Sequence, residues 1–245
     1  MSFQFSIENF INYLLGCRCL ICNKKISSID LEQLICNQCL QLLPKFSRQV
    51  ENACRICALP IVKELTICKY CENGELEYLD KTLAGYIYDF PVRNLILKLK
   101  FTPNRAIAKF LITELLNSII DLPSYSVENI NQIIPMPIHD NRLLFRGFNQ
   151  SIVLAKLLAK QTGIPVNINL VNKIKDNGVQ EGRTRKQRFQ NIKNSFKVSA
   201  NCQNQNYILI DDVMTTGASI NELARVLKKQ GANSCNALVV CRAVL

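Results

Sequence analysis

Residues 207–231 decide the fold, and they read YILIDDVMTTGASINELARVLKKQG. The apolar run at 207–210 predicts a buried strand. Two carboxylates, Asp211 and Asp212, follow in what we expect to be an acidic turn. From Ile220 onward the apolar residues recur every three to four positions, which predicts a helix that ends near Gly231. A loop between a buried strand and a helix lies at the edge of an open α/β sheet, where ligands commonly bind.

The loop between this strand and this helix suits a phosphate group. Its residues are Thr215, Thr216, Gly217, Ala218 and Ser219. Backbone N–H groups that lead into a helix N-terminus converge on an anion, hydroxyls add donors, and a glycine lets the backbone come close. The carboxylates of Asp211 and Asp212 would instead accept hydrogen bonds from a sugar diol. The predicted ligand is therefore a ribose 5′-phosphate with free 2′ and 3′ hydroxyls.

The alternative for this segment is a strand followed by an ordinary Asp-capped helix. The two aspartates alone would not exclude it, but the full order of strand, aspartates, hydroxyls, glycine and helix favours the phosphate site. A P-loop is excluded because no GK[ST] follows Gly217. Residues 210–219, IDDVMTTGAS, resemble the phosphoribosyl diphosphate (PRPP) motif of type I phosphoribosyltransferases.

Charge and cysteine content differ between the two parts of the chain. Residues 1–80 hold 8 basic and 9 acidic residues, whereas residues 81–245 hold 22 and 10. The second part should therefore attract polyanions such as nucleic acid or polyphosphorylated ligands. The apolar N-terminal stretch lacks a basic leading region and is too short to cross a membrane, so we expect a helix over 1–16 that packs on the protein. We expect a cytoplasmic protein without membrane insertion, in which clustered cysteines bind metal.

Four CxxC pairs predict a double zinc ribbon over residues 17–72. Each pair points two thiolates at one ion, and two pairs complete a four-thiolate site, so we expect two structural Zn²⁺ ions. Consecutive pairing gives the two sites, although a cross-brace of alternating pairs stays open. A redox or nucleic-acid-reading finger is less favoured than a scaffolding or protein-binding role, because few basic residues lie here. Cys17 is left over. The expected ligands are Cys19, Cys22, Cys36 and Cys39 for one site, and Cys54, Cys57, Cys68 and Cys71 for the other.

Residues 81–245 form the second expected domain. Strands are predicted at 81–88 and 131–137, and helices at 105–116 and 151–161. The loop 138–150 joins a strand to a helix, and it could hold a diphosphate or be an ordinary basic surface loop. His139 is more typical of a loop residue than of a catalytic base. The candidate diphosphate residues are Arg142, Arg146, Gly147, Phe148 and Asn149.

Residues 173–197 carry eight basic and two acidic residues, which predicts a flexible basic loop that runs into a short helix near 184–191. Such a loop could close over a diphosphate and exclude water from the reaction. With its two phenylalanines it would equally suit single-stranded nucleic acid. The sequence does not separate these two uses. The basic residues singled out are Arg183, Arg185, Lys186 and Arg188.

The chain as a whole resembles the ComF family, in particular its ComFC-type competence proteins. The resemblance is carried by the CxxC pairs, LKLKF, IIPMPIHDNRLLFRGFNQ, Gln180…Arg188…Asn191 and YILIDDVMTTGAS. It implies an α/β domain over 81–245, with a type I phosphoribosyltransferase-like parallel sheet flanked by helices, behind a small zinc-ribbon module. It also implies PRPP binding with Mg²⁺, a role in natural transformation and DNA uptake, single-stranded DNA as a partner, and a ComFA-type helicase as another. Residue 2 is Ser, so glutamine-dependent amide transfer is not expected.

Two classes of function follow from these expectations. The first is a PRPP-binding, phosphoribosyltransferase-like protein of competence, which as an enzyme would transfer a pentosyl group and displace pyrophosphate to an acceptor that the sequence does not name. No residue stands out as its general base. The second is a non-catalytic module that binds single-stranded DNA or docks a helicase through a degenerate site.

Overall fold

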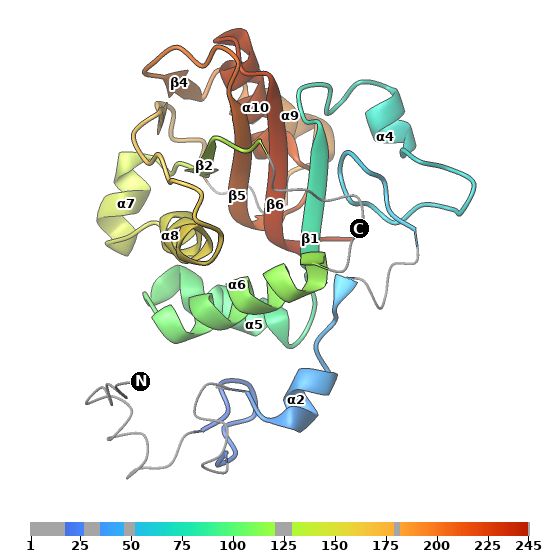
Figure 1. The fold of residues 1–245 in the computed structure, drawn as a ribbon, viewed down its shortest axis with the longest axis vertical. Helices are drawn as coiled ribbons and strands as arrows, with labels where there is room; N and C mark the ends of the chain where they lie inside the picture. Colours follow the sequence, from blue (N-terminus) through green and yellow to red (C-terminus); the bar gives the residue numbers. More distant parts are fainter. Residues whose placement is uncertain (1–17, 27–34, 47–51, 121–128, 179–181, 245) are drawn as a thin grey trace.

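The computed structural model describes residues 18–26, 35–46, 52–120, 129–178 and 182–244 (Figure 1). The centre of this described part is a four-stranded sheet in the order β1-β6-β5-β2. All neighbouring strands in it run parallel. The predicted α/β class with a parallel sheet is therefore confirmed. The strands are β1 (Lys81–Ile87), β2 (Gln132–Pro135), β5 (Asn206–Met214) and β6 (Ser234–Arg242).

The two central strands are β5 and β6, and each contains a continuous apolar run, at 207–210 and 237–241. Parallel strands covered on both faces read this way because neither face meets water. Their register pairs Tyr207 with Cys235 and Met214 with Arg242. The expectation of an acidic turn was wrong, because Asp211 and Asp212 lie inside β5. The strand continues to Met214 since β6 pairs with it along this whole length.

Helices cover both faces of the sheet (Figure 1). One apolar core gathers the helices α5 (Val92–Phe101), α6 (Arg105–Ile120) and α8 (Gln150–Thr162) around side chains such as Ile208 and Ile210. The other core packs α9 (Arg185–Ile192) and α10 (Ala218–Lys229) around Leu209. The predicted helices at 105–116 and 151–161 are confirmed and are slightly longer. The short α7 (Asp140–Arg146) lies between β2 and α8.

The basic segment 173–197 connects the two strands of a small antiparallel sheet. Strands β3 (Val171–Lys173) and β4 (Phe196–Val198) pair antiparallel, and the segment between them contains α9. Helix α9 begins with a capping box, in which the Thr184 hydroxyl accepts from the Gln187 backbone N–H and the Gln187 side chain accepts from the Thr184 backbone N–H. This local signal produces the short helix that the sequence predicts.

Two very short helices, α2 (Asn37–Gln41) and α4 (Lys69–Glu72), each contain the last cysteine of a CxxC pair. Figure 1 shows α2 below α5 and α4 beside the upper end of β1. Cys19 and Cys39 pack into the core of α5, α6 and α8, whereas the cysteines from Cys54 to Cys71 pack into the core of α10. The two cysteine groups therefore attach to different faces of the sheet. Among the described helices, none is long and apolar enough to cross a membrane.

Candidate functional site

A pocket opens where β5 ends and α10 begins. It is lined by Asp211, Arg188 and the whole of the loop 213–219. Gly217 caps α10 with a left-handed φ of 83°, which favours glycine. A Cβ there would lie 2.6 Å from Met214 Cε and 3.0 Å from Leu76 Cδ1. The structure thus brings the predicted loop residues to one pocket, at the carboxyl edge of the sheet.

The two aspartates have different surroundings. Asp211 lines the pocket, and its Oδ1 accepts a hydrogen bond from Ser151 Oγ at 3.0 Å. Asp212 is buried, with 4% exposure. Its Oδ1 accepts from the backbone N–H of Val213, and its Oδ2 lies 3.3 Å from Lys100 Nζ on α5. In this structure only Asp211 is available to a ligand in the pocket.

Burial and the neighbouring carboxylate set the charge state of this pair. The pKa of Asp211 is raised to about 7, first by burial and then by repulsion from Asp212. The hydrogen bonds that Asp211 accepts from the Asp212 backbone N–H and from Ser151 lower this pKa, but they do not outweigh the burial. Burial would lower the pKa of Lys100, but attraction to Asp212 and then Asp211 outweighs it and raises that pKa. Lys100 therefore stays charged and compensates one carboxylate of the pair.

The basic residues of α9 also have different roles. Arg188 Nη1 donates to Thr215 Oγ1 at 3.0 Å and lines the pocket. Arg185 instead pairs with Glu75 at 2.5 Å and lies 4.1 Å from the ring centre of Tyr70. Among the four singled-out cations only Lys186 is exposed, and the other three are partly buried. The sequence predicts all four in one flexible loop, whereas in the structure Arg188 lines the pocket at the end of β5 and Arg185 contacts the segment after Cys68.

The segment 142–149 lies apart from the pocket wall. Arg142 donates to the Gly178 carbonyl, and Arg146 donates to Gln150 Oε1 at 3.3 Å. Gly147 ends α7 in the left-handed region, and Phe148 is partly buried beyond it. A diphosphate would have to draw both arginines out of these contacts.

Asn149 already uses both ends of its amide. Its Nδ2 donates to the Met136 carbonyl at 3.0 Å, and its Oδ1 accepts from Ser151 N at 2.9 Å as the N-cap of α8. These bonds place Ser151 in the first turn of α8, within reach of Asp211. Asn149 therefore acts on the site indirectly in this structure, because it fixes the position of Ser151.

The eight expected metal ligands form two separate groups in the described part of the chain. Within each group the sulfur atoms all lie within 4.8 Å of one another. Four sulfurs at about 2.3 Å from a tetrahedral zinc ion would be about 3.8 Å apart. The observed pairs Cys22–Cys36 at 3.7 Å and Cys57–Cys68 at 3.5 Å fit that spacing, so each group could hold zinc. The pairing is consecutive, and Cys17 lies outside the described residues.

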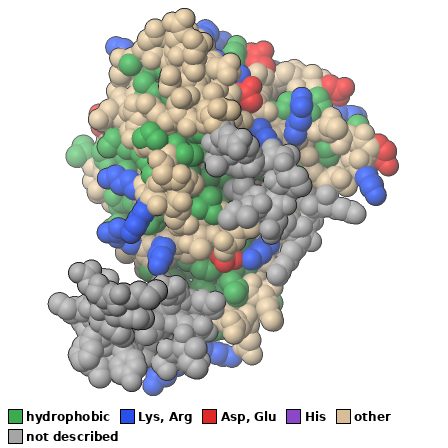
Figure 2. All heavy atoms as spheres, in the orientation of Figure 1, with side chains coloured by type: hydrophobic (Ala, Val, Ile, Leu, Met, Phe, Trp, Pro, Cys, Tyr) green, Lys and Arg blue, Asp and Glu red, His purple; other side chains and the backbone are tan. Residues whose placement is uncertain are grey.

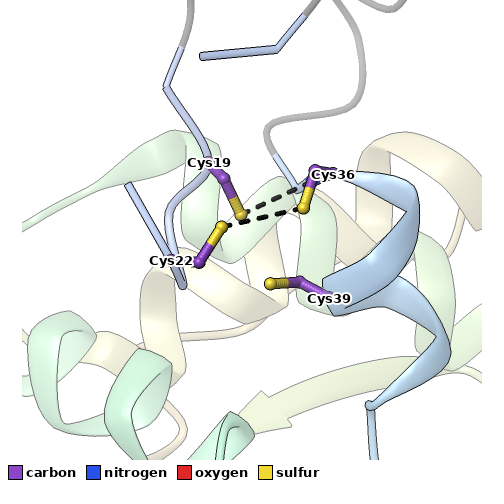
Figure 3. A group of neighbouring side chains, drawn as sticks. All are labelled: Cys19, Cys22, Cys36 and Cys39. Carbon is purple, nitrogen blue, oxygen red and sulfur yellow. Dashed lines mark hydrogen bonds between the residues drawn. The ribbon is translucent and has the colours of Figure 1, made fainter. Parts of the chain in front are cut away.

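In the first cluster, defined as Cys19, Cys22, Cys36 and Cys39, two chain segments turn their thiols toward one another (Figure 3). Burial alone would raise the pKa of Cys19, but hydrogen bonds from backbone N–H groups, including that of Cys36, outweigh it and lower the pKa to about 6. The second cluster, Cys54, Cys57, Cys68 and Cys71, is buried at all four positions. Because the thiolate is the form of cysteine that binds metal, the lowered pKa of Cys19 favours metal binding at the first cluster.

Sequence reasoning missed three residues that shape the site. Ser151 carries no motif signal, and the charge pattern around Lys100 fits a solvated helix face as well as ligand steering. Arg242 stands outside every motif, although a lone cation at the end of the apolar run ALVVC was a signal. It is 1% exposed, and its guanidinium reaches the end of β5 and the second cluster.

Comparison with known proteins adds independent evidence. Residues 149–243 match the family model of the phosphoribosyl transferase domain. Competence protein F of Haemophilus influenzae is 27% identical over 239 residues, which cover 96% of this chain and 99% of that protein. DNA utilization protein YhgH of Salmonella typhimurium is 27% identical over 209 residues, which cover 85% of this chain and 90% of that protein.

Competence protein ComFC of Bacillus subtilis is 24% identical over 232 residues, which cover 87% of this chain and 89% of that protein. The likeness to competence protein F extends over nearly the whole chain. This chain is therefore a homologue of proteins named competence protein F, ComFC and YhgH, with a match to the phosphoribosyl transferase domain over residues 149–243 and two four-cysteine clusters.

Proposed function

We propose that this protein binds PRPP in the pocket at the end of β5. One observation carries the proposal: Asp211, Arg188 and the loop 213–219 line a single pocket. A carboxylate suits the ribose diol, and a helix N-terminus with an arginine suits the 5′-phosphate. These groups occur together at the carboxyl edge of a parallel sheet, where α/β proteins bind ligands.

The remaining parts of the ligand would lie toward α7 and α8. Residues 142–149 are the proposed diphosphate segment, and Mg²⁺ would bridge the phosphates while it keeps several waters. Ser151 orients Asp211, and Lys100 offsets the charge of Asp212. The pair of aspartates can then remain next to a ligand that is itself strongly negative.

Titration calorimetry tests this proposal. PRPP with Mg²⁺ should bind the wild-type protein, and Asp211→Asn should weaken binding by about tenfold or more, because a hydrogen bond to a charged group contributes about 1.5–3 kcal/mol. Arg225→Met is a matched control, since Arg225 pairs with Glu222 on α10 and does not line the pocket. No heat of binding with the wild-type protein would reject the proposal.

Turnover is a further part of the proposal. As an enzyme the protein would release pyrophosphate from C1 of PRPP and transfer the ribosyl phosphate to an acceptor. A screen of nucleobases, amines and DNA ends for PRPP-dependent pyrophosphate release would find such an acceptor. Activity that survives in Asp211→Asn would have to come from another site or a contaminant.

The relatives named competence proteins support a role in competence. We place that role in the cytoplasm, where the protein would handle incoming single-stranded DNA together with a ComFA-type helicase. The basic excess of residues 81–245 is consistent with a polyanionic partner. Figure 2 shows Lys and Arg side chains gathered on the side where α7 and α8 lie.

A second candidate is a DNA-binding module without turnover. The observation that favours it is the exposure of Lys186 in the first turn of α9, three residues after the partly exposed Arg183. DNA affinity should fall steeply with added salt. The double variant Arg183→Gln, Lys186→Gln should reduce the slope of log affinity against log salt concentration by about two, which is one for each lost phosphate contact. Arg185 and Arg188 are poor choices for this test, because both make contacts within the protein. An unchanged slope would exclude this surface.

A further inference from the structure

One buried guanidinium joins the second cluster to the loop 213–219, which is the proposed phosphate loop. Arg242 is the last residue of β6 and is 1% exposed. Its Nε donates to the Cys57 carbonyl at 2.7 Å. Its Nη1 donates to the carbonyls of Met214 at 3.0 Å and Ala243 at 2.6 Å, and also to that of Thr215. The backbone of a cluster cysteine and the backbone that opens the loop therefore share one side chain.

The charge of Arg242 needs a partner that its hydrogen bonds do not supply. All four acceptors are neutral carbonyls, and Nη2 has no hydrogen-bond partner among the described residues. A buried cation without a counter-charge is strongly destabilising. The second cluster is the nearest candidate for that partner, because Arg242 Nε donates to the carbonyl of one of its cysteines, Cys57. Four thiolates around Zn²⁺ leave negative charge in excess, so a zinc-loaded second cluster supplies the missing counter-charge.

The chain that follows the second cluster also supports the loop. Leu76 packs against Gly217, since a Cβ on that glycine would lie only 3.0 Å from Leu76 Cδ1. Asn221, in the first turn of α10, accepts from the Tyr78 backbone N–H at 3.2 Å and donates to the Glu75 carbonyl at 3.3 Å. The residues joined by these two hydrogen bonds are more than 140 positions apart in the sequence. The cluster and the loop are therefore parts of one packed unit.

We propose that Arg242 is a positioning residue that couples metal in the second cluster to the phosphate loop. In a trans peptide the C=O and the following N–H point in opposite directions. Because Arg242 holds the carbonyls of Met214 and Thr215, the N–H groups of Thr215 and Thr216 point away from it. The inference rests on the proposed function, since those N–H groups are among the donors proposed for the 5′-phosphate.

The coupling has a reciprocal consequence. If metal in the second cluster improves ribose phosphate affinity, then ribose phosphate must improve metal retention by the same factor. The first cluster lies in the core of the opposite face and has no such link to Arg242 among the described residues. Only one of the two clusters should therefore respond to the ligand.

Hydrogen exchange tests the role of Arg242. Arg242→Met removes the guanidinium, Arg242→Lys keeps the charge without the fork of donors, and Arg225→Met is the matched control on α10. Amide exchange in residues 213–219 should rise by about 5- to 150-fold in Arg242→Met, the usual range for coupled sites, and less in Arg242→Lys. Exchange at 206–210 should change little, whereas a purely structural role would raise it equally.

Zinc release provides the second readout. In Cys22→Ser, which disables the first cluster, ribose 5-phosphate should slow release of the remaining zinc to a chelator, and Arg242→Lys should reduce that effect. Unchanged exchange at 213–219 in a folded Arg242 variant would overturn the inference. If Arg242→Met does not fold, the exchange rates of Arg242→Lys and the zinc assay still test the proposed role of Arg242. If the wild-type protein binds no ribose 5-phosphate, the proposed function fails, whereas the exchange data still test Arg242.

Discussion

Arg188 Nη1 lies 3.0 Å from Thr215 Oγ1, so a cation from α9 meets the first hydroxyl of the phosphate loop. The two residues belong to separate motifs in the sequence, one basic and one hydroxyl-rich. In the folded protein they line the same pocket. A phosphate in that pocket would meet a positive charge in addition to backbone N–H groups.

Arg188→Met should therefore weaken PRPP binding more than neutralisation of any exposed cation nearby. Loss of a charge-assisted hydrogen bond of about 1.5–3 kcal/mol corresponds to a roughly 10- to 150-fold higher Kd. Lys186→Met, two residues earlier and exposed, is the matched control. Equal Kd values for the two variants in calorimetry would remove Arg188 from the site.

The Lys100–Asp212 pair should contribute to stability. Lys100→Met leaves the carboxylate of Asp212 buried without its cation, which should lower the free energy of unfolding by about 3 kcal/mol. The double variant Lys100→Met, Asp212→Asn should recover most of this loss, because the unpaired charge is gone. Urea denaturation measures both. Lys98→Met on the same helix should change stability by about 0.5 kcal/mol or less, and a Lys100→Met variant that behaves like it would contradict the account.

Asp211 should make stability depend on pH. Its pKa of about 7 in the folded protein lies above the ordinary value of 3.8. The unfolded chain therefore releases this proton first, and the stability that the protonated form contributes is lost as pH rises from about 4 through 7. Asp211→Asn keeps an acceptor for Ser151 and removes the ionisation. Its Tm should exceed that of the wild-type protein at pH 8 and approach it at pH 4; a constant difference at both pH values would show that Asp211 ionises normally.

The two clusters should lose metal at different rates. Cys22 of the first cluster is exposed and Cys36 is partly exposed, whereas all four cysteines of the second are buried. A chelator should therefore remove zinc in two phases of one ion each, with the fast phase absent in Cys22→Ser. Atomic absorption and a colorimetric chelator give the stoichiometry and the rates. A single phase that accounts for both ions would show that exposure does not control release.

Much of this architecture could be predicted because its signals are local. The run 207–210 and the periodic residues from 220 onward specify a strand and a helix directly, and four CxxC pairs specify two metal groups. The boundary of β5 could not be read, because Asp211 and Asp212 resemble a turn. They stay in the strand only because β6 continues to pair with it.

The different contacts made by residues of the same motif could not be predicted either, because they depend on segments that are distant in the sequence. Nothing local tells that Lys100 reaches Asp212, or that Arg185 is held by Glu75 and Tyr70 while Arg188 turns to the loop. Arg242 was hidden for the same reason. Its four carbonyl acceptors come from three segments that meet only after the sheet has assembled.

PRPP is the ligand proposed for the pocket at the end of β5. Amide hydrogen exchange of the wild-type protein, with and without PRPP and Mg²⁺, tests this proposal most directly. We expect the ligand to protect residues 211–219 strongly and α9 around Arg188 as well, and we expect Asp211→Asn to remove this protection. Binding with no protection at 211–219, or with protection confined to other segments, would contradict it.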